Sequence, residues 1–341
     1  MLRHRSPRLL TATVAALALT AAGSFAADKL PASLAGDLGQ PTGKIAFIRG
    51  GNIWIMNANG SDQFKVSEVG NADGRISWSP DGRRLAFTRS GQVTLKAPDN
   101  LGGKHKVYDI FLAYLDSAEA GKTFWWYRLT DDLGSRDPEW GPDGTITFTK
   151  DMNANTVNAL LPNYQICTMN EDGDDFEILR KDWQNLPKFF TTPSVSPDGK
   201  IAFVLLDPKE GPVGIGILPK RHFMAPMDSI IAQVETMRGN VAPSWSPDGK
   251  WLAYVKNSLT EGGLYIATPD LSKKYLVFEP PVGATMSVRT PSWSPNSKWL
   301  TFGTTDGSIW VVDITGQKPR RISGPGTDSA PAWSKGMPKK K

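Results

Sequence analysis

The hexapeptide Ser77-Trp78-Ser79-Pro80-Asp81-Gly82 decides the fold of this 341-residue chain, because it returns several times along the sequence. Further copies begin at Glu139, Ser194, Ser244 and, in weaker form, Ser292. Successive copies start about 50 residues apart, a period typical of stacked structural repeats. A half copy, Ala332-Trp333-Ser334, stands close to the C-terminus. The sequence therefore predicts repeated modules packed side by side.

Each copy is followed by a short apolar strand that ends in an aromatic residue. These strands are Leu85–Phe87, Ile146–Phe148, Ile201–Phe203, Leu252–Tyr254 and Leu300–Phe302, and a sixth, Ile45–Phe47, precedes the first full copy. Proline presets φ in the turn before the strand, and the Asp-Gly pair suits the rest of a tight hairpin. A third alternating strand and a weaker fourth one, such as Tyr127–Thr130, complete each unit. The pattern predicts an all-β, six-bladed propeller with four-stranded antiparallel blades.

The two ends of the repeat region complement each other. The first unit lacks its first strand, and the chain finishes with a first strand, Pro331–Ser334, that lacks a unit. We predict that this C-terminal strand joins blade one and closes the ring, which also hides two sheet edges. The propeller should span residues 43–335, preceded by a flexible N-terminal arm over 27–42 and followed by a basic tail over 336–341.

Residues 1–26 have the features of a secretory signal peptide. Three arginines precede the apolar stretch Leu9–Ala22, and Ser24-Phe25-Ala26 offers small residues before a cleavage site. The apolar stretch has 14 residues, fewer than the roughly 20 that cross a bilayer as a helix. We therefore expect a periplasmic or secreted protein with no membrane span in the mature chain.

Charge and cysteine content indicate what the chain is not expected to bind or to form. Removing the leader takes away three of the 39 basic residues, so the mature chain is close to neutral against 34 acidic residues. This balance gives no reason to expect a nucleic-acid partner. Cys167 is the only cysteine and cannot form an intramolecular disulfide. Its place in a predicted strand favours a buried, inert thiol.

The segment Ile53-Trp54-Ile55-Met56-Asn57-Ala58-Asn59-Gly60-Ser61, together with the Trp-Ser-Pro-Asp-Gly repeat, resembles the TolB-like β-propeller family. The resemblance covers residues 43–335 and implies a ring of blades around a central channel that could hold a cation. TolB itself carries another domain before its propeller, and we expect the short arm of this chain to leave no room for one. No other cofactor is expected.

Loop lengths point to one face of the ring as a binding surface. The Pro-Asp-Gly hairpins are short and should be structural, whereas most of the variation in loop length falls on the opposite face. Candidate partner-binding residues there are Lys104, His105 and Lys106 in the loop 91–108, and Trp183, Phe189 and Phe190 in the crossing 181–192. An equally weighted alternative is that the aromatic residues cap blade edges and the lysines are only solvated.

The sequence offers no catalytic set. His105 and His222 are the only histidines after the leader, and they map to opposite faces, so a shared metal or acid–base pair is not expected. We predict a non-enzymatic, monomeric scaffold that binds an envelope or secreted protein. The alternative is a glycan- or peptide-binding protein or enzyme that uses carboxylates and tryptophans at the channel mouth.

Overall fold

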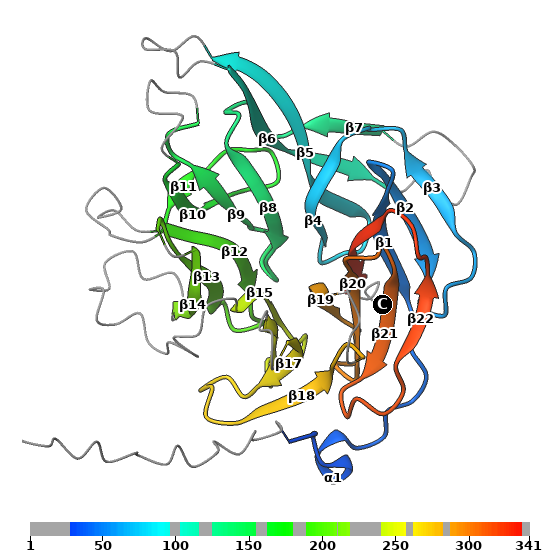
Figure 1. The fold of residues 1–341 in the computed structure, drawn as a ribbon. Helices are drawn as coiled ribbons and strands as arrows, with labels where there is room; N and C mark the ends of the chain where they lie inside the picture. The colour runs from blue at the N-terminus through cyan, green and yellow to red at the C-terminus, as the bar shows by residue number, and fades with distance from the viewer. Residues whose placement is uncertain are drawn as a thin grey trace, which may run out of the picture.

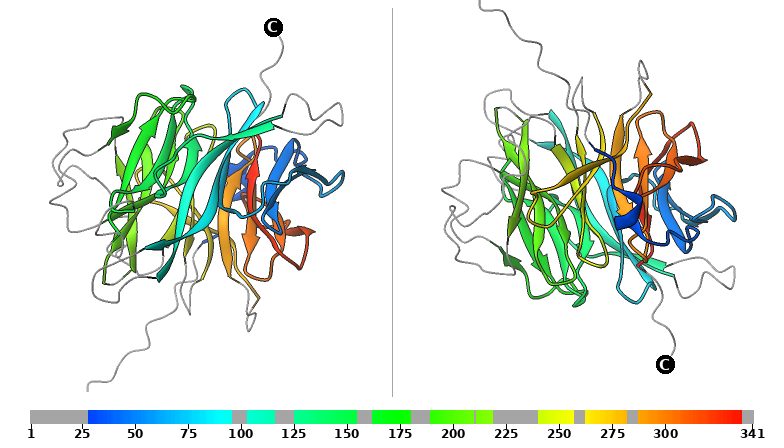
Figure 2. Two further views of the ribbon diagram at one scale, coloured as in Figure 1. Left: turned by 90° about the horizontal axis from the view of Figure 1, so that it is seen from above. Right: turned by 90° about the horizontal axis from the view of Figure 1, so that it is seen from below.

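The fold is a closed ring of six antiparallel sheets (Figures 1 and 2). The computed structural model describes residues 28–95, 103–115, 125–154, 162–179, 189–209, 211–218, 240–256, 262–281 and 287–335. Among these residues five sheets have four strands and one has three, and in all but blade one the strands follow in chain order from the channel to the rim. The predicted six-bladed β-propeller is confirmed. The predicted signal peptide and basic tail lie outside the described residues.

Every blade has its innermost strand at the channel and its outermost strand at the rim. From the channel outwards, blade one contains β23 (Asp328–Trp333), β1 (Lys44–Arg49), β2 (Asn52–Asn57) and β3 (Phe64–Ser67); blade two contains β4 (Ala72–Trp78), β5 (Arg84–Leu95), β6 (Gly103–Tyr114) and β7 (Trp125–Arg128). Blade three contains β8 (Ser135–Trp140), β9 (Ile146–Asp151), β10 (Tyr164–Met169) and β11 (Glu177–Ile178); blade four contains β12 (Phe189–Val195), β13 (Ile201–Asp207) and β14 (Gly211–Leu218). Blade five contains β15 (Asn240–Trp245), β16 (Leu252–Lys256), β17 (Gly263–Ala267) and β18 (Lys274–Phe278); blade six contains β19 (Val288–Trp293), β20 (Trp299–Thr304), β21 (Ile309–Asp313) and β22 (Arg320–Ser323).

The ring closes in blade one, where β23 from the C-terminal end pairs antiparallel with β1 (Figure 1). The closure reproduces the hydrogen bonds of an ordinary hairpin. In blade five, the Ser246 amide donates to the Trp251 carbonyl, and the Trp251 amide donates to the Ser246 hydroxyl. In blade one, Ser334 and Lys44 make the same two contacts, at 2.8 and 3.2 Å, across the chain ends. The predicted closure is confirmed.

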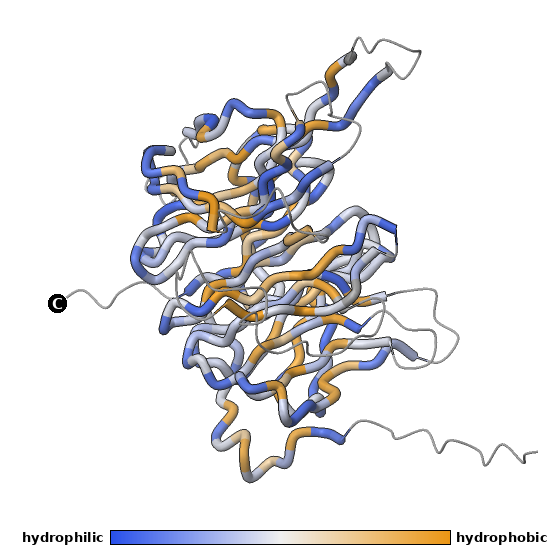
Figure 3. Tube along the Cα trace, turned by 90° about the vertical axis from the view of Figure 1, so that its left-hand side faces the viewer, coloured by the Kyte–Doolittle hydropathy of each residue, from blue (hydrophilic) through white to orange (hydrophobic). Residues whose placement is uncertain are grey.

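The core lies between neighbouring blades, because alternate residues of each strand face opposite sides of its sheet. In β1, Ala46 and Ile48 pack towards blade two, whereas Ile45 and Phe47 pack towards blade six. The predicted aromatic residue of each second strand is fully buried. Hydropathy coloured along the chain shows apolar stretches in the blades and polar loops at their ends (Figure 3). Each blade is therefore stabilised mainly by its two neighbours.

The repeated aspartates are turn residues, as the sequence predicts. Asp81 accepts hydrogen bonds from the Ser79 hydroxyl and the Arg83 amide, and Asp198 accepts one from the Ser196 hydroxyl. Hydrogen bonds from Lys200 and Ser196 lower the pKa of Asp198. In blade six Asn296 accepts the equivalent bond from Ser294 at 2.7 Å. Since a neutral amide serves equally well there, the acceptor oxygen rather than the charge is what the turn requires.

The N-terminal segment is packed on the propeller and is not the flexible arm that the sequence predicts. Leu30 and Ala35 are buried against blades five and six, and the short helix α1 (Ala32–Ala35) lies at the rim of the disc (Figure 1). The Lys29 ammonium donates to the Val277 carbonyl at 3.1 Å, and the Trp299 indole donates to the Leu38 carbonyl at 3.0 Å. Buried apolar side chains and several hydrogen bonds of this kind, including those to the Asp28 and Ala35 carbonyls, hold this glycine- and proline-containing segment.

The predicted loop 91–108 is also corrected, because its described residues, 91–95 and 103–108, are all strand. Strands β5 and β6 pair continuously from Arg84 with Tyr114 to Leu95 with Gly103. This long hairpin projects beyond the disc at the top of Figure 1. Residues such as Val93, Thr94 and Lys104 suit a pair of strands that is exposed on both faces. Because such strands need no regular alternation of apolar and polar residues, the sequence does not reveal them.

Cys167 is buried in β10, as predicted, and its burial raises the pKa of the thiol to about 12. Folded protein at neutral pH should hold about a thousandfold less thiolate than an exposed cysteine would give. We expect a thiol reagent at pH 8 to leave Cys167 unmodified in buffer and to modify it fully in denaturant, as followed by mass spectrometry. Rapid modification of folded protein would contradict the inert assignment.

Candidate functional site

The innermost strands share one backbone irregularity that shapes the central channel. Each of the six contains a residue with positive φ at a bulge in its pairing with the second strand: Gly74, Asp137, Thr192, Ala242, Thr290 and Ala330. In five blades a proline follows this residue. In blade two Arg75 follows instead. The repeat is therefore broken at one point, and a cationic side chain enters the channel there.

Arg75 spans the channel between blades. Its side chain is 6 % exposed, and its guanidinium donates to the carbonyl oxygens of Pro193 and Pro243 in blades four and five. The bond to Pro243 is 2.8 Å long, and Glu139 Oε2 lies 4.0 Å from Nη1. A planar guanidinium with several donors suits such divergent acceptors, whereas an ammonium acts as one point charge. Arg75 therefore separates the two ends of the channel.

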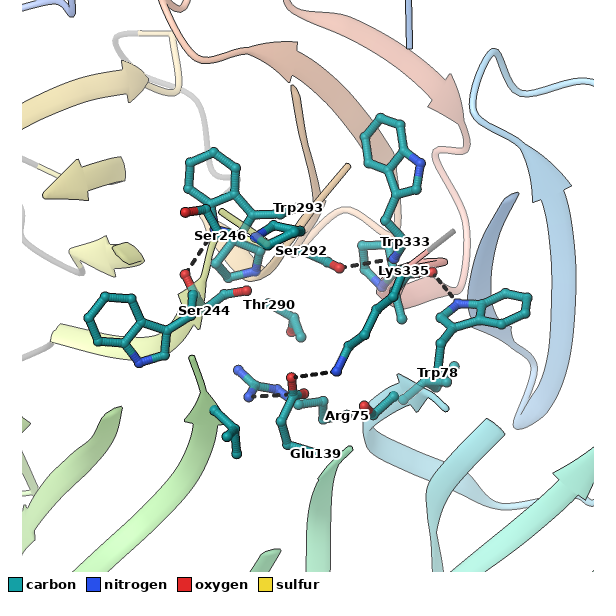
Figure 4. A pocket seen from close by; sticks show the side chains of 18 of the residues that line it. Arg75, Trp78, Glu139, Ser244, Ser246, Thr290, Ser292, Trp293, Trp333 and Lys335 are labelled. Atoms are coloured by element: carbon teal, nitrogen blue, oxygen red, sulfur yellow. Dashed lines mark hydrogen bonds and ion pairs between the residues drawn. The ribbon is translucent and has the colours of Figure 1, made fainter. Parts of the chain in front are cut away.

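One end of the channel, on the Pro-Asp-Gly face, is a cavity of about 260 Å³. Turn prolines such as Pro80 and Pro142 line its wall, with Glu139 and Lys335 among its polar groups (Figure 4). The Lys335 ammonium donates to the Trp140 carbonyl and lies 3.5 Å from Glu139 Oε1. The tryptophan rings at this mouth are only 2–6 % exposed. Their faces are thus largely covered by protein.

The other end of the channel, on the loop face, is a more polar cavity of about 370 Å³. Asp73, Asp137 and Asp328 contribute carboxylates, but each already has a protein partner. Asp328 is buried and accepts two hydrogen bonds from Arg49, both 2.7 Å long, and the bond to Asp328 raises the pKa of Arg49. Among the described residues no group of three or more His, Cys, Asp or Glu side chains is arranged to hold a metal.

A cation in the channel therefore stays a prediction. Two of the carbonyl oxygens that could serve such an ion, those of Pro193 and Pro243, accept hydrogen bonds from Arg75. At this level of the channel the Arg75 guanidinium supplies the positive charge that a bound cation would otherwise bring.

A row of stacked cationic and aromatic side chains crosses blades two to four, and we call Lys106, Tyr108, Arg136, Tyr164 and Phe189 the ladder. The Lys106 ammonium lies 5.3 Å from the centre of the Tyr108 ring. The Arg136 guanidinium lies between two rings, 5.3 Å from Tyr108 and 4.5 Å from Tyr164. The rings of Tyr164 and Phe189 meet edge to face at 5.9 Å. Such contacts hold the ladder in one arrangement.

Charges around the ladder reinforce it. Burial lowers the pKa of Arg136, but Asp137 and the two tyrosines outweigh this effect, so that its pKa is raised overall. Burial raises the pKa of Tyr164. The Lys106 ammonium also pairs with Asp73, and this hydrogen bond raises the pKa of Lys106. At neutral pH the two cations of the ladder therefore stay charged and Tyr164 stays neutral.

The structure brings two of the predicted binding residues together and separates others. Lys106 and Phe189 are both part of the ladder, and Lys104 is exposed on β6. His105 is partly buried, with no hydrogen-bond partner for its Nε2 among the described residues. Phe190 is 3 % exposed and packs edge to face on Phe203, so its side chain belongs to the core of blade four. Trp183 lies outside the described residues.

Sequence reasoning missed three charged residues of the channel, Arg75, Glu139 and Lys335. Each stands where the chain departs from its own repeat. Arg75 takes the place of a proline after the bulge, Glu139 replaces the first serine of the hexapeptide, and Lys335 replaces its proline. Aligning the copies column by column and asking where charge enters would have found all three.

These features define a six-bladed β-propeller whose channel is crossed by an arginine, and its fold is similar to that of solved TolB structures. A TolB structure from Acinetobacter baumannii superimposes with a TM-score of 0.60 at 20 % identity, covering 86 % of this chain and 66 % of that one. The chain thus spans just under two thirds of that TolB chain. A putative TolB from Agrobacterium tumefaciens gives 0.57 at 14 %, covering 84 % of this chain and 90 % of that one. A chain of a nidogen–laminin complex gives 0.58 at 10 %, covering 85 % and 98 %.

The comparisons show the fold alone, because all three identities are 20 % or below. No protein-family model and no curated protein matches the sequence. Among the described residues, no helix is both long and apolar enough to cross a membrane.

Proposed function

We propose that the protein is a non-enzymatic, exported scaffold of the bacterial periplasm or cell envelope that binds another protein through the loop face of blades two to four. The observation that carries this proposal is the ladder from Lys106 to Phe189. It joins three blades into one rigid surface beside the projecting β5–β6 hairpin. Aromatic residues and arginine are the residue types enriched where proteins bind proteins.

The proposed export rests on the leader-like segment 1–26 and on the likeness of the fold to TolB structures. The proposal of a scaffold rather than an enzyme rests on the sequence, which offers only two histidines beyond that segment and no nucleophile motif. The partner is expected to be an envelope or secreted protein, and the propeller itself a monomer.

Site-specific crosslinking tests the proposed face. We expect a photoreactive amino acid at Lys104, on the hairpin, to crosslink to a discrete protein in the living envelope, because its side chain projects from this surface. Lys250 is a matched control, since it is exposed on the Pro-Asp-Gly face. Crosslinked products are identified by mass spectrometry. Equal yields from both positions, or none from Lys104, would exclude the proposed face.

The channel mouth offers a second candidate, a small ligand held on the Pro-Asp-Gly face. The cavity of about 260 Å³ favours it, but the covered tryptophan rings speak against glycan stacking. A thermal-shift panel of sugars, peptides and divalent metals separates the two candidates, because a ligand that binds only the folded state raises the melting temperature.

A further inference from the structure

We propose that the cavity on the Pro-Asp-Gly face binds the ammonium group of a lysine on an extended segment of another protein, and that Lys335 occupies this site as an internal competitor. The site lies on the opposite face from the ladder. It therefore stands independently of the proposed function above.

The oxygen atoms at the site are the kind of hydrogen-bond acceptors that an ammonium group needs. The Lys335 ammonium is held by the Trp140 carbonyl and the Glu139 carboxylate, both from the end of β8. Figure 4 shows Lys335 reaching towards Glu139. An ammonium has three donors and no acceptor, so a carbonyl beside a carboxylate matches it in both charge and hydrogen bonding. The Glu139 side chain is only 16 % exposed, which limits solvent screening of the pair.

The neighbouring Arg75 does not turn the cavity into an anion site. Its two terminal nitrogens donate to the carbonyls of Pro193 and Pro243, across the channel. With Lys335 in place, two cations and one carboxylate face this end of the channel. Without Lys335, Arg75 and Glu139 balance each other, and the Trp140 carbonyl can accept from an incoming ammonium.

The cavity walls fit an extended segment. Pro80, Pro142, Pro197 and Pro247 line the mouth and have no backbone N–H to offer, so the wall presents apolar rings to the methylene stem of a lysine. Ligand pockets for drug-sized molecules begin at about 300 Å³, so this smaller cavity suits one or two side chains. A single lysine with its flanking backbone is the matching occupant.

Lys335 can leave without opening the ring. It follows the last residue of β23 by two positions, and the hydrogen bonds between Ser334 and Lys44 hold the strand end independently. The Lys335 side chain is 34 % exposed, so its ammonium has a path to solvent. A second lysine presented at high local concentration can therefore displace it.

Replacing Lys335 tests the proposal in the full-length protein. The probe is the peptide acetyl-Ser-Lys-Gly-amide, and the readout is a titration followed by tryptophan fluorescence, with calorimetry as the second measurement. We expect Lys335→Met to bind the peptide about tenfold more tightly than the wild type, because the competitor is gone. Adding Glu139→Gln to Lys335→Met should reverse this gain. Lys250→Met, on the same face but outside the cavity, should behave as the wild type.

Three outcomes would overturn the proposal. The first is equal affinity of the wild type and Lys335→Met for the lysine peptide. The second is equal binding of a norleucine peptide, which has the stem without the ammonium. The third is no binding of the lysine peptide to Lys335→Met. Since none of these readouts involves the loop face, they leave the crosslinking result at Lys104 unaffected.

Discussion

A chain that stops at Thr327 is expected to lose the whole propeller and not only one blade. The deletion removes β23, and with it the innermost strand of blade one. Trp333 is 2 % exposed and packs between blades one and six, while Ala330 and Ala332 pack towards blade two. Because each blade is stabilised by its neighbours, an open ring exposes apolar faces on both sides of the gap.

A point variant within β23 shows how much the packing of one of its side chains contributes to stability. Trp333→Ala should lower the free energy of unfolding by about 3–5 kcal/mol, the usual cost of truncating a buried tryptophan. That is a large part of the stability of an ordinary domain. Circular dichroism and urea unfolding measure both changes. A chain that ends at Lys335 is the control, because it keeps every described residue and should unfold with the wild-type midpoint.

A monomeric, cooperatively folded protein from the chain ending at Thr327 would contradict the closure argument. So would a urea midpoint for Trp333→Ala within error of the wild type. Oligomers would not, since contacts between copies could then cover the sheet edges that the missing β23 leaves open.

The repeat made this architecture predictable because a propeller blade is defined by local sequence. Turn chemistry, strand alternation and the buried aromatic residue each depend on a few adjacent positions, and they recur in every copy. The closure was predictable for the same reason, since a half copy at one end matches a missing strand at the other. Strand order is then set by antiparallel hairpins without further assumptions.

Features set by distant contacts were not predictable. The segment 28–42 has the composition of a linker, yet Leu30 and Ala35 are buried against strands more than 200 residues away. Its anchoring depends on a surface that exists only after the ring has formed. The ladder is similar, because Tyr108, Arg136 and Tyr164 come from three separate strands and meet only through blade packing.

The channel depends on which way a bulged strand turns its side chains. A single left-handed residue reorients the next side chain, so the repeat alone does not say that Arg75 faces Pro193 and Pro243 while prolines stand at this position in the other blades. The repeat does mark the position of the exception. Arg75, Glu139 and Lys335, the charged residues of the cavity on the Pro-Asp-Gly face, thus all stand at departures from the repeated pattern.

Arg75→Met is expected to be the most destabilising substitution of a polar residue in the channel. Methionine keeps much of the volume but leaves the carbonyls of Pro193 and Pro243 without the donors they now have. Each buried polar group left without a partner costs about 1–3 kcal/mol. We expect the free energy of unfolding to fall by about 3–5 kcal/mol, which urea unfolding measures directly.

Two further variants separate the hydrogen bonds of Arg75 from its charge. Arg75→Lys keeps the charge but carries its donors on one nitrogen, whereas the guanidinium reaches the two carbonyls with two separate nitrogens, so lysine should recover only part of the loss. Glu139→Gln should cost far less, because its carboxylate lies 4.0 Å from Arg75 and is partly exposed. If Arg75→Met were as stable as the wild type, hydrophobic filling would replace the arginine, as it can for buried ion pairs. Arg75 would then be retained for the polarity of the channel and not for holding blades two, four and five together.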